Sequence, residues 1–157
     1  MVHRPSESVT HRQIHPRMVE AMLNHAAHDR PAEACGLLAV DSQGRVRFVY
    51  CLSNADASAR AFTIAPDEYF GANRHAERHG WEIAGVFHSH PNGSPGPSSI
   101  DLNAAPAADW LYIVVARDQA RLYALQDRTF RLVGRLATDV GKDVGPLPPT
   151  RAIGSLA

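Results

Sequence analysis

The sequence predicts a single α+β domain (a mixed α/β fold) in which two or three helices pack on a central sheet of six to eight strands. Three observations lead to this prediction. Short apolar or alternating segments between turn residues indicate hairpins, and longer segments repeat apolar residues at helical spacing. The 157 residues suffice for one hydrophobic core but hardly for two.

Proline, glycine and serine mark the expected helix ends. Pro16 and Pro66 suit the first turn of a helix, because proline lacks the N–H that this turn leaves unpaired. Apolar residues recur every three to four positions after Pro16, Gly80 suits the end of the second helix, and Ser98 or Ser99 can cap a third, short one. Helices are therefore expected over residues 16–29, 66–79 and 98–105.

Strands are expected where apolar or alternating residues stand between turn residues. Residues 35–40 are apolar without interruption, and apolar and polar residues alternate over 45–52. With the turn residues 41–44 between them, the two segments have the pattern of a hairpin. The same pattern recurs around residues 127–128. The expected strands cover 9–14, 35–40, 45–52, 62–64, 82–88, 111–116, 121–126 and 129–136.

Composition limits the function classes and the domain plan. Sixteen basic residues balance sixteen acidic ones, which argues against a dedicated nucleic-acid binder. No apolar run is long enough for a membrane span, and the N-terminus lacks the apolar core of a secretory signal. Two cysteines are too few for a disulfide framework. A cytoplasmic protein is therefore expected. We expect a flexible N-terminus over 1–8, the domain over 9–136 and a Pro/Gly-rich tail over 137–157.

The chemistry-bearing residues gather after the expected strand 82–88. His88 and His90 stand two apart, so their side chains share one face of a strand. Asp101 follows in the first turn of the expected third helix, behind a stiff loop rich in proline and glycine. Two histidines and one aspartate leave a fourth coordination position open, which is typical of catalytic zinc.

These residues resemble a known motif. His88-x-His90-Pro, followed by Ser98 and then x-x-Asp101, is similar to the JAMM motif of the MPN+ metallopeptidases, which carry a JAB domain. Glu33, in an upstream Glu-Ala-Cys-Gly segment, is similar to the glutamate that this family also needs. The resemblance spans about residues 9–136, and the absence of inserts is similar to the stand-alone prokaryotic branch, typified by a peptidase of a sulfur-carrier protein.

The resemblance implies a JAB/MPN fold with a cytidine-deaminase-like sheet, and it implies a role for each motif residue. His88, His90 and Asp101 would bind Zn²⁺. Glu33 would act as general base and then as acid, and Ser98 would donate a hydrogen bond to the oxyanion. The substrate would be the C-terminal tail of a small ubiquitin-like or sulfur-carrier protein. Cleavage after its C-terminal glycine would release an amino acid such as cysteine, and a homodimer is one option for assembly.

Several alternatives remain beside this interpretation. The chain could be a non-catalytic MPN-type binding scaffold, or a relative of the DNA-associated RadC-type JAB proteins. Glu33 could be a solvated loop residue and Ser98 only a helix cap. Cys35 is expected to be a buried hydrophobe. The histidine pairs on the expected helices, read as solvated helix faces rather than as zinc ligands, are His25 with His28 and His75 with His79.

Overall fold

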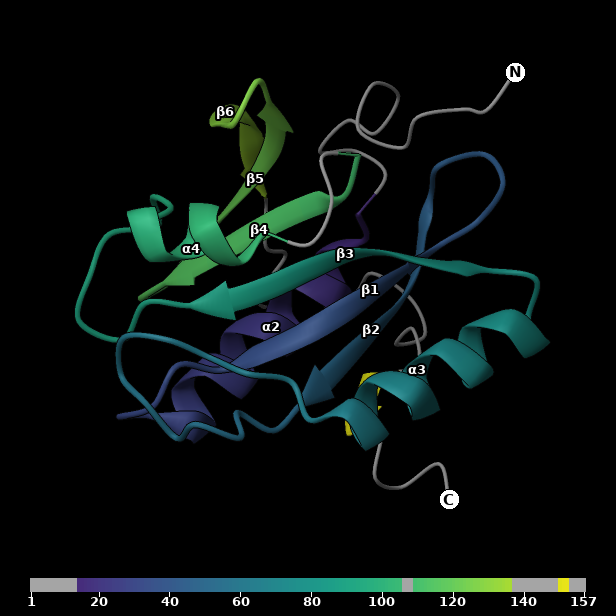
Figure 1. Cartoon of the computed structure of the whole chain (residues 1–157), viewed down its shortest axis with the longest axis horizontal. Helices are drawn as coiled ribbons and strands as arrows, with labels where there is room; N and C mark the ends of the chain where they lie inside the picture. Colours follow the sequence, from purple (N-terminus) through teal and green to yellow (C-terminus); the bar gives the residue numbers. More distant parts are fainter. Residues whose placement is uncertain (1–13, 106–108, 137–149, 153–157) are drawn as a thin grey trace.

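The structure is a computed structural model that describes residues 14–105, 109–136 and 150–152 (Figure 1). The helices in these ranges are α2 (Pro16–Asp29), α3 (Pro66–Arg78) and α4 (Ser99–Ala104). The strands are β1 (Cys35–Val40), β2 (Val46–Leu52), β3 (Glu82–Ser89), β4 (Leu111–Ala116), β5 (Gln119–Gln126), β6 (Thr129–Leu136) and β7 (Thr150–Ala152).

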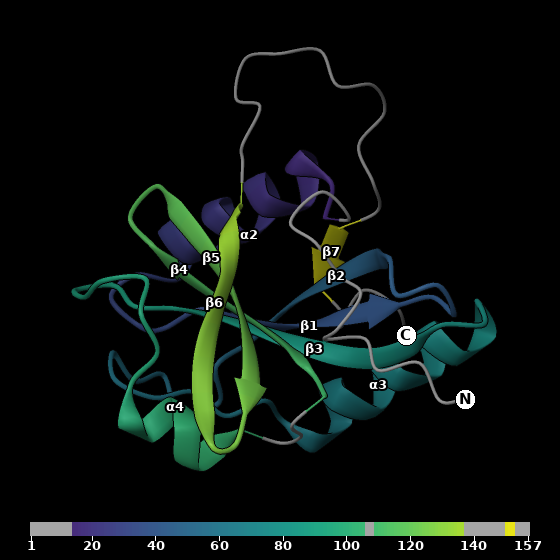
Figure 2. The ribbon, with the colours of Figure 1, turned by 90° about the horizontal axis from the view of Figure 1, so that it is seen from above.

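All of these strands belong to one sheet with the order β6-β5-β4-β3-β1-β2-β7. Neighbouring strands are antiparallel except for the pairs β3–β4 and β2–β7, which run parallel. Helix α2 covers one face of the sheet, and α3 and α4 lie on the opposite face (Figure 2). The prediction of a mixed α/β fold with a central mixed sheet is confirmed.

The two covered faces explain why the central strands read as continuous apolar runs. Every residue of β1 is buried, because successive side chains enter two different cores. Leu38 and Val40 pack in the core below α2, whereas Leu37 and Ala39 pack in the core below α3. Strand β3 lies between β1 and β4 and ends at Ser89, so its C-terminal end is held from both sides.

Four segments differ from the expectations or fall outside the structure. Residues 62–64 form no strand: Ile64 makes only an isolated bridge with Asn54, because the amide of Thr63 donates to the Asn54 side chain instead of to a ladder. Strand β5 begins earlier than expected. Strand β7 lies within the expected tail and pairs with β2. Apart from Ile14, the expected strand 9–14 lies outside the described residues.

The expected N-terminus 1–8, and the expected tail apart from β7, also lie outside the described residues, so the domain division stays a prediction. No helix in the described part of the chain has the length and apolar character needed to cross a membrane.

Candidate metal centre

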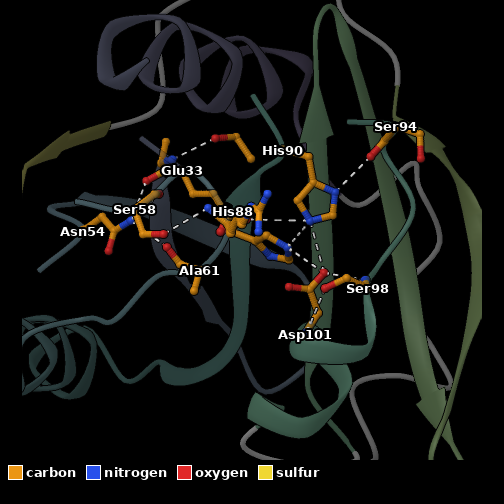
Figure 3. A network of polar contacts seen from close by, with 12 residues as sticks. Glu33, Asn54, Ser58, Ala61, His88, His90, Ser94, Ser98 and Asp101 are labelled. Atoms are coloured by element: carbon orange, nitrogen blue, oxygen red, sulfur yellow. Dashed lines mark hydrogen bonds and ion pairs between the residues drawn. The ribbon is translucent and has the colours of Figure 1, made fainter. Parts of the chain in front are cut away.

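Glu33, His88, His90 and Asp101 converge at one end of the sheet (Figure 3). Each offers one ligand atom, and these four atoms all lie within 4.8 Å of one another. Glu33 stands just before β1, His88 lies near the end of β3, His90 directly follows β3, and Asp101 lies in the first turn of α4. Among the described residues this is the one group of three or more such side chains that could hold a metal ion.

Three of these atoms form a nearly regular triangle. The Nε2 atoms of His88 and His90 are 3.1 Å apart, and each lies 3.1 Å from Oδ2 of Asp101. Ligands about 2.0–2.1 Å from a tetrahedral zinc ion would be roughly 3.3 Å apart. The triangle therefore has nearly the size of one face of a zinc tetrahedron, with the opposite corner open. Two imidazole nitrogens and a carboxylate also form a donor set that zinc accepts.

The loop after β3 orients His90. The carbonyl oxygen of Ser94 lies 2.9 Å from Nδ1 of His90. A carbonyl can only accept, so Nδ1 carries a proton, and in the neutral ring that a metal would bind, Nε2 is left with its lone pair toward the centre. Gly93 packs against the His90 ring, where an added Cβ would lie 3.3 Å from the His90 Cβ. The hydroxyl of Tyr123 donates to the carbonyl of Pro95 at 2.9 Å and ties the loop to β5.

Ser98 and Asp101 form a capping box at the start of α4. The Asp101 amide donates to Ser98 Oγ at 3.1 Å, and the Ser98 amide donates to Asp101 Oδ2 at 2.7 Å. The same Oδ2 faces the two histidines, so the cap also aims the carboxylate at the centre. The Ser98 side chain accepts the amide and keeps its O–H available, which makes the cap compatible with hydrogen-bond donation to a substrate.

Glu33 is buried beside the triangle, with an exposed fraction of 1%. Its Oε1 lies 3.7 Å from Nε2 of His90, and its Oε2 is buried without a hydrogen-bond partner. Burial raises the pKa of Glu33 to about 7; His90 lowers it and the Asp101 carboxylate raises it. A carboxyl group with this pKa can both take up and release a proton near neutral pH.

Two charged groups near Glu33, Asp101 and His90, are favoured in their ionised forms, whereas burial favours the neutral form of Glu33. Burial acts to raise the pKa of Asp101, but hydrogen bonds from His88 and His90 outweigh it and hold that pKa well below its usual range. Burial acts to lower the pKa of His90, but its contacts with Asp101 and with the Ser94 carbonyl raise that pKa overall. The carboxylate of Asp101 is therefore ionised and suited to a cation, while Glu33 is poised to exchange a proton.

A mostly apolar cavity of about 240 Å³ opens beside the triangle, on the face of the sheet that carries α3. His88 and Asp101 line it on the side of the centre, and Phe62 stacks on the His88 ring with centroids 5.0 Å apart. Its remaining wall includes side chains from α3, from the segment before β4 and from β6, namely Tyr69, Trp110 and Phe130. The volume exceeds that of an apolar cavity of about 150 Å³ that can bind benzene.

The other histidine pairs do not form a second centre among the described residues. His75 is half-buried rather than on a solvated face: its Nδ1 lies 2.8 Å from the Tyr50 hydroxyl, and Phe48 packs against its ring. His79 is exposed and stacks on Trp81.

On the opposite face of the sheet, His25 is half-buried and its Nε2 lies 2.8 Å from the Leu52 carbonyl, whereas His28 is exposed. Cys35 is buried as expected, and burial raises the pKa of its thiol to about 12.

Sequence reasoning missed the residues that hold Glu33 in place. Ser89, between the two histidines, accepts the Ala34 amide on its Oγ at 2.7 Å, and its own amide donates to the Ala34 carbonyl. On the other side, the Asn54 side chain donates to the Glu33 carbonyl at 3.0 Å. The Ser-Asn-Ala-Asp turn after β2 was the available signal for Asn54, since Asn in such a turn often bonds nearby backbone.

Comparison with known proteins places the chain in a family. Residues 15–132 match the family of prokaryotic homologues of the JAB domain, and the chain belongs to this family. It is 35% identical over 105 residues to a desampylase of Haloferax volcanii, across 63% of this chain and 76% of that protein. It is 28% identical over 127 residues to the CysO-cysteine peptidase of Mycobacterium tuberculosis, across 80% of this chain and 86% of that one.

Solved structures support the same fold. A protein from Desulfitobacterium hafniense has a TM-score of 0.66 at 28% identity, covering 79% of this chain and 92% of that one. A JAB1/MPN domain protein from Archaeoglobus fulgidus has a TM-score of 0.52 at 19% identity, covering 79% and 96%, and shows the fold alone. The JAB/MPN fold expected from the motif is thereby confirmed.

Proposed function

We propose that this chain is a zinc-dependent amide hydrolase. Its substrate would be a small ubiquitin-like or sulfur-carrier protein, cut after the C-terminal glycine so that an amino acid such as cysteine is released. The observation that carries the proposal is the placement of a buried glutamate, with a pKa near neutrality, against a compact His-His-Asp triangle. The names of the desampylase and CysO-cysteine peptidase relatives support this class of substrate.

His88, His90 and Asp101 would hold the zinc ion. When bound, zinc supplies a Lewis acid that polarises a carbonyl and lowers the pKa of water to roughly 7. The histidine tautomer set by Ser94 and the carboxylate aimed by the cap of α4 prepare the site for a dication. A scaffold without metal would have no evident use for this arrangement.

Glu33 would move the proton. Its carboxylate, whose Oε1 lies 3.7 Å from Nε2 of His90, can accept a proton from the attacking water and then deliver that proton to the leaving amine. The exposed Ser98 would donate its O–H to the oxyanion that develops on the scissile carbonyl. Glu33 and Ser98 would thus have separate roles, one in proton transfer and the other in binding the oxyanion.

The substrate tail would approach in an extended form. The apolar cavity beside His88 can take an apolar side chain of that tail, while backbone hydrogen bonds from a strand-like pairing would fix its direction. The two free thiols suit a reducing compartment, so we propose the cytoplasm. Neither nucleic acid nor membrane is part of the proposal, and a homodimer stays a prediction.

The first expected result is metal-dependent cleavage of a carrier adduct. A small ubiquitin-like protein ending in Gly-Gly and extended by one cysteine should lose that cysteine on incubation with the purified protein. Intact-protein mass spectrometry measures the loss. Chelator should stop the reaction and added zinc should restore it, because the water and carbonyl both need the cation. An adduct that stays whole with the zinc-loaded protein, across several such carriers, would refute the proposed function.

The second expected result concerns metal content. The purified chain should hold about one zinc ion, and the double variant His88→Ala with His90→Ala should hold almost none, because a single carboxylate remains of the triangle. Elemental analysis gives the ratio. The matched control is His25→Ala with His28→Ala, a pair outside the centre that should keep its zinc. Equal zinc in the two double variants would place the metal elsewhere.

A further inference from the structure

Among the described residues, no hydrogen bond anchors the side chain of Glu33. Nε2 of His90 lies 3.7 Å from Oε1 of Glu33, beyond hydrogen-bond distance, and Oε2 is buried without a partner. A group that transfers a proton must nevertheless be held within hydrogen-bond reach of the reacting atoms. The direction of this carboxylate therefore depends on the packing around the buried side chain and on where the backbone of Glu33 is held.

That backbone is held from two sides. On one side, Ser89 exchanges hydrogen bonds with Ala34, the residue after Glu33. On the other side lies the segment 53–65 between β2 and α3: the Glu33 amide donates to the Ser58 carbonyl at 2.8 Å, and the Glu33 carbonyl accepts from Nδ2 of Asn54 at 3.0 Å (Figure 3).

Asn54 is the hub of the 53–65 segment. Its Nδ2 also donates to the carbonyls of Ala61 at 3.0 Å and Ser58 at 3.3 Å. Its Oδ1 accepts the amides of Asp56 at 3.0 Å and Thr63 at 3.1 Å. One half-buried carboxamide thus closes the turn that presents Ser58 to Glu33, and it binds Glu33 directly.

We infer that Asn54 is a positioning residue for the proposed general base Glu33, an inference that rests on the function proposed above. Asn54 has no hydrogen bond to the metal ligands in any contact described. It meets the cavity lining only at its rim, where its Oδ1 accepts the Thr63 amide and it bridges Ile64, so we expect its effect on the proton transfer to pass through the Glu33 backbone. Because a displacement of about 1 Å can lower a rate by roughly 100-fold, losing this anchor should lower kcat more than it changes KM.

Asp41 offers a matched control at the other end of β1. Its side chain also organises a turn, since Oδ1 accepts the amides of Gln43 at 2.9 Å and Arg45 at 3.0 Å. Both Asn54→Ala and Asp41→Ala therefore remove an acceptor that closes a turn after a strand. Only Asn54→Ala removes a contact with Glu33.

The experiment compares these two variants with the parent chain in the carrier-adduct assay, in zinc content and in amide hydrogen exchange of the metal-free protein. For Asn54→Ala we expect a kcat at least about 10-fold lower, a KM within about 3-fold, one zinc per chain and faster exchange in peptides covering 31–36. For Asp41→Ala we expect the parent kcat and faster exchange around 41–45 only.

Three results would overturn the inference: equal kcat in the two variants, unchanged exchange over 31–36, or loss of zinc in parallel with activity, which would place Asn54 in support of the metal ligands instead. If Asn54→Ala does not fold, Asn54→Asp replaces it, because the carboxylate keeps the acceptor for Asp56 and Thr63 but loses the donor to Glu33. If the parent chain cleaves no carrier adduct, the proposed function fails, while the exchange data still decide whether Asn54 holds Glu33.

Discussion

Replacing Glu33 by glutamine should lower kcat on a carrier adduct by about 100- to 10,000-fold while zinc stays bound. Glutamine has nearly the shape of glutamate and keeps hydrogen-bonding atoms, but it cannot take a proton from water at neutral pH. His88, His90 and Asp101 are unchanged, so the metal should remain. Single-turnover kinetics together with elemental analysis check both parts.

The stability of the metal-free protein provides the control for this variant. The pKa of Glu33 is raised from 4.5 to about 7, so the folded state holds this proton more tightly than the unfolded chain does. The corresponding stability is present below pH 4.5 and is lost as pH rises through 7. Glu33→Gln stays neutral, so its free energy of unfolding should exceed that of the parent by up to about 3 kcal/mol at pH 8 and by little at pH 5.

Denaturant titrations at the two pH values, both with chelator, measure this difference. A variant that is inactive and also less stable than the parent at pH 8 would indicate damage to the fold rather than loss of a base. Near-parent turnover by a zinc-loaded Glu33→Gln protein would remove Glu33 from the proton transfer altogether.

The sequence was informative wherever local chemistry decides the structure. Pro66 begins α3 as expected, and the run 35–40 is a strand because two cores bury both of its faces. The triangle could be foreseen because two of its ligands stand two apart where one strand ends, and the third lies in the first turn of a helix that a serine caps.

What the sequence left open depends on contacts between segments distant in the chain. The parallel pairing of β3 with β4 could not be read from either strand, since both are almost wholly buried and suit several neighbours. Likewise, 62–64 has the residues of a strand, but the Asn54 carboxamide captures the Thr63 amide and leaves only a bridge. The hydrogen bond from the Asn54 side chain to the Glu33 carbonyl joins residues 21 positions apart, so no local sequence pattern indicates this pairing.

Glycine directly before the scissile bond should be required for cleavage. We expect that residue to lie between the His90 ring, against which Gly93 packs, and Ser98 at the start of α4, because the oxyanion that Ser98 would stabilise belongs to this residue. The loop between them is held by the Tyr123 contact with Pro95 and by its prolines, so it should not widen at low cost. A β-branched side chain at this position would displace the carbonyl from Ser98 or press on the loop.

Valine in place of that glycine should therefore lower kcat/KM by at least about 100-fold, which corresponds to roughly 3 kcal/mol at the transition state. The same glycine-to-valine change several residues upstream in the flexible tail is the matched control, and it should have little effect, because the tail there lies beyond the centre. Competition of the glycine and valine adducts in one tube, followed by mass spectrometry, gives the ratio of kcat/KM directly. Equal cleavage of the two adducts would mean that the site accepts a branched side chain next to the scissile bond, and the argument from a narrow approach would then be wrong even if the metal chemistry stands.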